Sequence, residues 1–242
     1  MKKKWFKRMF VIVLAVVMVA SLAACGGSNS GGEPQNQGSG GAATGEVPKG
    51  IVPGTEITVV TGDEYNVHTP TDEDCDWLFS HIYDTLYWAV DGDWSNIQPL
   101  LAKDTQYSED RTTVVITLDD RAKFTNGNPV NGEAVAASLN YARENFPAYF
   151  ARFDSFEATG DYEVTVHLKA PEPEFEMILS LSWAGIVDMS AVNAAPADDP
   201  NSGAIGSGPF YIDSYTQADM LVLKANENYW CEERMPHIET IN

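Results

Sequence analysis

The chain has 242 residues, and its formal net charge at pH 7 is −20. So acidic a body is poorly suited to bind nucleic acid or an anionic membrane surface, because both would repel it. The length suits one large domain or two small ones once the non-structural N-terminal region is set aside.

The first 24 residues read as a targeting segment. Several cations precede the apolar run from Met9 to Val19, which is shorter than the roughly 20 apolar residues of a membrane-spanning helix. Leu22-Ala23-Ala24-Cys25 resembles the lipobox of bacterial lipoproteins, which implies cleavage before Cys25 and attachment of diacylglycerol to its sulfur. The alternative is an ordinary signal peptide followed by a chance cysteine. Either kind of segment exports the body to an oxidising, extracytoplasmic compartment.

Residues 25–54 are expected to form a flexible linker. Gly, Ser, Asn, Gln and Pro dominate this stretch, and it has almost no apolar side chain to bury. Such a tether would hold a folded body away from the membrane. Two further cysteines, Cys75 and Cys231, could form a disulfide in an oxidising compartment, although sequence alone does not bring them within bonding distance.

The first predicted strand runs from Ile57 to Thr61 and ends in a short polar loop. The loop consists of Gly62, Asp63, Glu64 and Tyr65. Loops at strand ends are common places for ligand contact, so these four residues are candidate ligand-binding residues. A plain connecting loop is the alternative.

Helices and strands alternate in the next part of the chain. A helix is predicted over residues 72–87, because Leu78, Ile82 and Leu86 recur at helical spacing. A hairpin with an Asp-Gly turn should follow over residues 87–94. The later predicted elements are a strand over 112–118, a helix capped by Asn131, a hairpin over 156–168 that turns at Gly160-Asp161, and a helix over 174–181.

A tight passage at Gly206 and Gly208 follows the polar segment 196–202. We expect the chain to cross there from one lobe to another, because glycine allows a backbone path that other residues do not. The passage lacks the spacing of a phosphate-binding loop. Two strands should follow it, over 210–212 and 220–225.

The sequence carries no recognisable pattern of catalytic or metal-binding residues. Its four histidines are scattered, and it has no His-x-x-x-His, Cys-x-x-Cys or Gly-x-Ser-x-Gly. Pairs of carboxylates are so frequent in this acidic chain that they discriminate nothing. We therefore predict no enzyme, no cofactor and no metal. A secreted hydrolase is the alternative, and turnover of a peptide or glycoside would favour it.

A series of short segments carries a family resemblance. In chain order they are Ile82 to Leu86, Leu100 to Ala102, Val114 to Leu118, Phe124 to Val130, Asp161 to Val166, Lys169 to Pro173, Ile205 to Tyr211 and Ala225 to Trp230. Their order and spacing resemble the family 5 extracellular solute-binding proteins of ABC importers, the oligopeptide, dipeptide and nickel-binding group. The chain lacks the first glycine of the family pattern before Phe124, and it has Ser207 and Cys231 where threonine and glycine are usual.

The resemblance covers about residues 55–242 and implies an α/β fold of the periplasmic-binding-protein type (type II, cluster C) with mixed-sheet lobes. Residues 66–202 would form a smaller inserted α/β lobe. Residues 55–65 and 203–242 would be segments of an incomplete main lobe, so the strand near 57–60 should share a sheet with 209–212 or 220–223. Family members are longer than this chain. The resemblance therefore implies that the second ligand-binding lobe is absent, as in a truncated or split gene product or an incomplete sequence.

The function implied by the resemblance is solute capture without catalysis. The protein would be a monomer, lipid-anchored outside the cytoplasm, which takes up a peptide or a related small solute for an ABC permease. Nickel chelates, opines and oligosaccharides are other solutes that such a fold holds. In the family, the segment after the first strand supplies backbone contacts to the peptide, which favours residues 62–65 as the ligand-facing edge. The alternatives are a remnant without a transport role and a fragment that assembles with a separately encoded second lobe.

Overall fold

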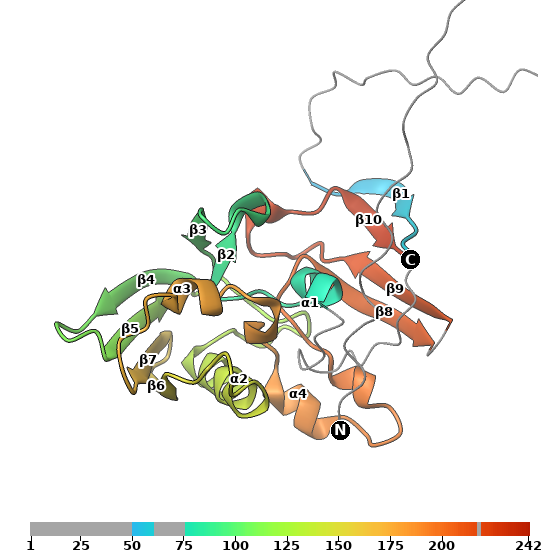
Figure 1. The fold of residues 1–242 in the computed structure, drawn as a ribbon. Helices are drawn as coiled ribbons and strands as arrows, with labels where there is room; N and C mark the ends of the chain where they lie inside the picture. Colours follow the sequence, from blue (N-terminus) through green and yellow to red (C-terminus); the bar gives the residue numbers. More distant parts are fainter. Residues whose placement is uncertain (1–49, 61–75, 217–218) are drawn as a thin grey trace, which may run out of the picture. The chain divides into compact units, whose positions relative to one another are not determined.

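The computed structural model describes residues 50–60, 76–216 and 219–242, which belong to one compact unit (Figure 1). Their strands form two four-stranded sheets and one two-stranded hairpin. The first sheet has the strand order β1 (Val52–Ile57), β10 (Ile238–Ile241), β9 (Met220–Ala225) and β8 (Phe210–Thr216). The second has the order β4 (Ala102–Tyr107), β5 (Thr113–Leu118), β7 (Glu163–Leu168) and β6 (Phe153–Gly160). The hairpin pairs β2 (Tyr87–Ala89) with β3 (Ile97–Pro99), and the α-helices are α1 (Asp76–Ile82), α2 (Gly132–Asn145), α3 (Phe175–Ile178) and α4 (Met189–Ala194).

The sheet β4-β5-β7-β6 is antiparallel and packs one face on helix α2. Along β5, Val114, Ile116 and Leu118 are buried and alternate with partly exposed residues, which is the pattern of a strand with one apolar face. Helix α2 begins where the sequence predicts, because the side-chain oxygen of Asn131 accepts a hydrogen bond of 2.9 Å from the backbone N–H of Ala134. These local signals fix both the strand and the helix.

The sheet β1-β10-β9-β8 joins segments from the two ends of the described chain. Strand β1 runs parallel to β10, and the other pairs are antiparallel, so the sheet is mixed. Ile57 lies opposite Ile241. The first strand therefore shares a sheet with residues 210–216 and 220–225, as the family resemblance implies. Helix α1 covers this sheet, with Leu78 and Phe79 in the same apolar cluster as the buried strand residues.

Two N-terminal boundaries differ from the sequence prediction. Strand β1 begins at Val52 and ends at Ile57, so it starts inside the stretch expected to be flexible linker, and residues 58–60 are not part of it. Its backbone pairs with β10, beginning with a hydrogen bond of 3.1 Å from the N–H of Val52 to the carbonyl of His237. Pairing with a partner far along the chain stabilises a strand that contains Pro53 and Gly54, which strand propensity alone does not favour.

Two helices are also shorter than predicted. Within the described part of the predicted 72–87 helix, α1 covers only Asp76–Ile82. The N–H of Gly208 donates to the carbonyl of Ile82, and the chain then leaves the helix toward β2. Helix α3 has four residues instead of the eight predicted. The hairpin at β2 and β3 is present, but its connection spans residues 90–96 rather than a two-residue Asp-Gly turn.

The glycine passage is a close approach between two segments of the chain. A Cβ atom on Gly206 would lie 1.9 Å from the carbonyl oxygen of Ile82, and one on Gly208 would lie 2.7 Å from that of His81. The carbonyl of Gly206 also accepts a hydrogen bond of 2.9 Å from the N–H of Thr125. The passage therefore joins α1 to the turn before α2, and no side chain larger than hydrogen fits at Gly206.

A prediction follows from this contact. Gly206→Ala should lower the free energy of unfolding by about 3 kcal/mol, because the methyl group meets rigid backbone at the end of α1. Urea denaturation followed by tryptophan fluorescence measures the change. Gly160→Ala is the matched control, because its Cβ would lie 3.2 Å from the Cβ of Glu163 and 4.0 Å from the nearest backbone atom, the nitrogen of Glu163. The control should change stability by less than about 1 kcal/mol, and an equal loss in both variants would contradict the close-approach argument.

Candidate functional site

The carboxylate of Asp84, two residues after the end of α1, is fully buried and accepts four side-chain hydrogen bonds. Its Oδ1 accepts hydrogen bonds from the hydroxyl of Tyr229 (2.9 Å) and from Nη1 of Arg234 (3.1 Å). Its Oδ2 accepts from the indole N–H of Trp230 (2.8 Å) and the hydroxyl of Ser207 (3.2 Å). The carboxylate thus joins the end of α1 to the glycine passage and to the segment after β9.

Burial and hydrogen bonding have opposite effects on the pKa of Asp84. Burial raises the pKa of the Asp84 carboxyl, and the Arg234 cation and the three other donors act against that rise. Burial and the adjacent Asp84 charge also raise the pKa of Tyr229, so its hydroxyl remains a donor. A buried carboxylate is stable only with this kind of pairing. We therefore interpret the network as a structural contact rather than as a reactive group.

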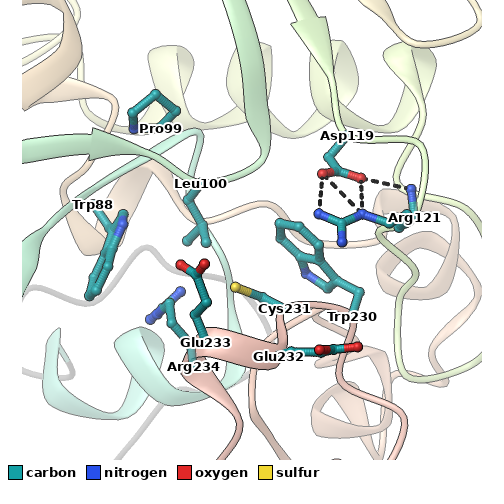
Figure 2. A pocket seen from close by; sticks show the side chains of 10 residues that line it. All are labelled: Trp88, Pro99, Leu100, Asp119, Arg121, Trp230, Cys231, Glu232, Glu233 and Arg234. Carbon is teal, nitrogen blue, oxygen red and sulfur yellow. Dashed lines mark hydrogen bonds and ion pairs between the residues drawn. The ribbon is translucent and has the colours of Figure 1, made fainter.

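A cavity of about 340 Å³ lies beside this network (Figure 2). Three parts of the chain form its walls: the β2–β3 hairpin, residues 119–121 after β5, and residues 230–234, where Glu232–Arg234 form a short 3-10 helix. Trp230 and Arg234 belong both to the cavity wall and to the Asp84 network. The Asp84 network therefore fixes the position of the cavity wall that contains Trp230 and Arg234.

Two guanidinium groups line the cavity, and each already has a carboxylate partner. Arg121 bonds Asp119 through Nη2 at 2.7 Å and through Nε at 2.9 Å, and these contacts lower the pKa of Asp119. Arg234 bonds Asp84. Each guanidinium also lies over an indole, Arg121 at 5.7 Å from the ring centre of Trp230 and Arg234 at 4.8 Å from that of Trp88. These contacts hold the cavity's cations in fixed positions.

The cavity wall also holds a thiol, and the described residues supply the cavity with neither a histidine nor a metal site. Cys231 is a free thiol, and burial raises its pKa, so it stays protonated and weakly nucleophilic near pH 7. Among the described residues, no histidine lines this cavity. Within residues 50–60, 76–216 and 219–242, no group of three or more His, Cys, Asp or Glu is placed to hold a metal ion. The cavity offers charge and aromatic surface, which suit recognition of a ligand.

The predicted site residues fall outside the described chain. Gly62 to Tyr65 and Cys25 lie in segments that the structure does not describe, and so does Cys75. Their roles stay predictions. The sequence reasoning missed the cavity, because its walls come from three distant segments. The one available signal was an acidic residue, Asp84, within an otherwise apolar run.

Comparison with known families gives a match over most of the described chain. The profile of the bacterial extracellular solute-binding proteins, family 5 Middle, matches residues 96–242. The probable D,D-dipeptide-binding periplasmic protein DdpA of Escherichia coli K12 is 30% identical over 165 residues, covering 64% of this chain and 32% of the relative. The glutathione-binding protein GsiB of Salmonella typhi is 25% identical over 195 residues, covering 77% of this chain and 37% of the relative. The chain thus spans about a third of the length of these relatives.

Solved structures give the same fold. NikA from Brucella suis, in complex with Fe(III)-EDTA, superposes with a TM-score of 0.67 at 23% identity, covering 77% of this chain and 38% of that one. The substrate-binding domain of an oligopeptide ABC transporter from Bacillus anthracis gives a TM-score of 0.67 at 16% identity, covering 80% and 42%. The family resemblance drawn from the sequence is confirmed, and so is the α/β fold of the periplasmic-binding-protein type.

The Asp84 network generates a stability prediction. Asp84→Ala should lower the free energy of unfolding by about 3–5 kcal/mol, because it leaves the Arg234 charge and three other donors without their acceptor. Chemical denaturation with two probes, circular dichroism and tryptophan fluorescence, would measure it. Asp213→Ala is the control, since Asp213 is exposed in β8, and it should change stability by less than about 0.5 kcal/mol. A loss below 1 kcal/mol for Asp84→Ala would mean that the network contributes little.

Proposed function

Because the chain belongs to the bacterial extracellular solute-binding proteins of family 5, we propose that it captures a peptide or a related small solute outside the cytoplasm for an ABC permease. The observation that carries the proposal is the family match over residues 96–242. The cavity supports recognition, since aromatic and charged side chains line it. We propose binding without catalysis, by a monomer that needs no cofactor and no nucleic acid.

The class of solute is proposed from the relatives. DdpA and GsiB are named for a D,D-dipeptide and for glutathione, which supports a short peptide as the solute. Solved relatives hold Ni(L-His)2 and mannopinic acid, so a chelate or an opine is the second class to test. All of these carry carboxylates and nitrogen groups. Such solutes offer both donors and acceptors to a polar protein surface.

We further propose that the two four-stranded sheets belong to two different lobes. Strand β1 pairs with β10 beside β9 and β8, while the chain between them forms the other sheet. This topology supports residues 66–202 as an inserted lobe, with residues 55–65 and 203–242 as segments of the main lobe. Gly62 to Tyr65, which follow the first strand, are the proposed ligand-facing edge.

The N-terminal segment supports anchoring to the membrane. No helix in the described residues is long and apolar enough to cross a bilayer. We propose that residues 1–24 are removed as a lipoprotein signal peptide. Cys25 would then carry the lipid, and residues 25–54 would serve as the tether, apart from the residues that begin β1.

A binding experiment tests the proposed function. Calorimetric titration of the full-length protein with D,D-dipeptides, glutathione and nickel–histidine should reveal one saturable ligand. Tyr65→Ala should weaken it about tenfold, which corresponds to a loss of about 1.4 kcal/mol. Tyr141→Ala on helix α2 is the matched control and should leave affinity unchanged. Binding of none of these classes would contradict the proposed solute, and equal affinity in both variants would remove Tyr65 from the site.

The lipid anchor has its own test. Cys25→Ser should abolish incorporation of labelled fatty acid and release the protein from the membrane fraction, because the thiol is the proposed attachment point. Cys231→Ser is the control and should remain labelled and membrane-bound. Labelling that persists in Cys25→Ser would place the lipid elsewhere or rule out lipidation at this residue.

A further inference from the structure

The cavity beside Asp84 contains a charge that its neighbours do not neutralise. The guanidinium groups of Arg121 and Arg234 are each paired with a carboxylate. Glu232 and Glu233 line the same cavity and are exposed, and their carboxylates make no ion pair or hydrogen bond with any described residue. The cavity therefore carries excess negative charge that an incoming cation would balance.

The two glutamates are not equivalent. Figure 2 shows the Glu233 carboxylate directed toward Leu100, while the Glu232 carboxylate points away from the rest of the group. Both oxygens of Glu233 are free to accept hydrogen bonds from a ligand. Glu233 is therefore the residue that would bind a positively charged head group.

The wall near Glu233 is apolar. Trp88, Pro99 and Leu100 come from the β2–β3 hairpin and the residue after it, and they give the cavity a hydrocarbon and aromatic side. An alkyl chain packed there would lose contact with water while its charged end stayed at the carboxylate. A simple inorganic cation would gain nothing from this wall. An anion would be repelled by the carboxylates of Glu233, Glu232 and Asp119. The guanidinium groups of Arg121 and Arg234, which could attract it, are already paired with carboxylates.

We propose that this cavity binds a small organic cation, an alkyl chain ending in an ammonium or guanidinium group. The Glu233 carboxylate pairs with the cationic head, and Trp88 and Leu100 pack against the chain. The volume of about 340 Å³ lies within the range of small-molecule pockets. The residues that carry this proposal do not include 62–65, so the proposal does not depend on which solute the protein carries.

The probe is n-pentylamine, which is a cation at pH 7, and its neutral counterpart is 1-pentanol. Titration of the full chain, followed by the indole N–H signals of the tryptophans in nuclear magnetic resonance spectra, reports binding at the cavity. Pentylamine should give saturable shifts, and Glu233→Gln should weaken it about tenfold while it keeps the size of the side chain. Glu227→Gln is the matched control, because Glu227 is exposed nearby in sequence and does not line the cavity.

The outcomes separate the proposal from simple surface attraction. Weaker binding in Glu233→Gln alone, with 1-pentanol binding more weakly than the amine, supports the cation site. Equal weakening in Glu227→Gln would show diffuse attraction to an acidic surface and would overturn it. Unchanged affinity in Glu233→Gln, equal binding of the alcohol, or the lack of any saturable shift would overturn it as well.

Discussion

The buried carboxylate of Asp84 is the contact on which the arrangement of the described residues depends. A charge removed from water is costly unless donors surround it, and here Ser207, Tyr229, Trp230 and Arg234 supply them. These partners lie more than a hundred residues further along the chain. The fold satisfies the carboxylate only when the end of α1, the glycine passage and the segment after β9 meet at one point.

The same contact determines the form of the cavity. Trp230 is held by its hydrogen bond to Asp84 and lies under the guanidinium of Arg121. Arg234 is held by its ion pair and lies over Trp88. Each indole in the cavity wall thus contacts a guanidinium group, and each guanidinium group is paired with a carboxylate. A surface built in this way is rigid before any ligand arrives, which reduces the entropy lost on binding.

Local patterns in the sequence predicted much of the fold but not the site. The cap at Asn131 and the alternation along β5 depend on residues close in sequence, and both are present in the structure. The end of α1 and the start of β1 depend on distant partners, and both boundaries were predicted wrongly. The Asp84 network was missed for the same reason, since no local pattern links that residue to a segment near Trp230. The mixed sheet that contains β1 was predicted through the family resemblance, because propensity does not reveal which strands pair.

Native-state hydrogen exchange, measured amide by amide, tests most directly whether the Asp84 network makes the two sheets one cooperative unit. The slowest amides of β5 and β7 and those of β8 and β9 should share one free energy of opening in the wild-type protein. In Asp84→Asn, the amides of β8 and β9 should open at a lower free energy than those of β5 and β7. Two sheets that already open independently in the wild-type protein would contradict the role assigned to this carboxylate.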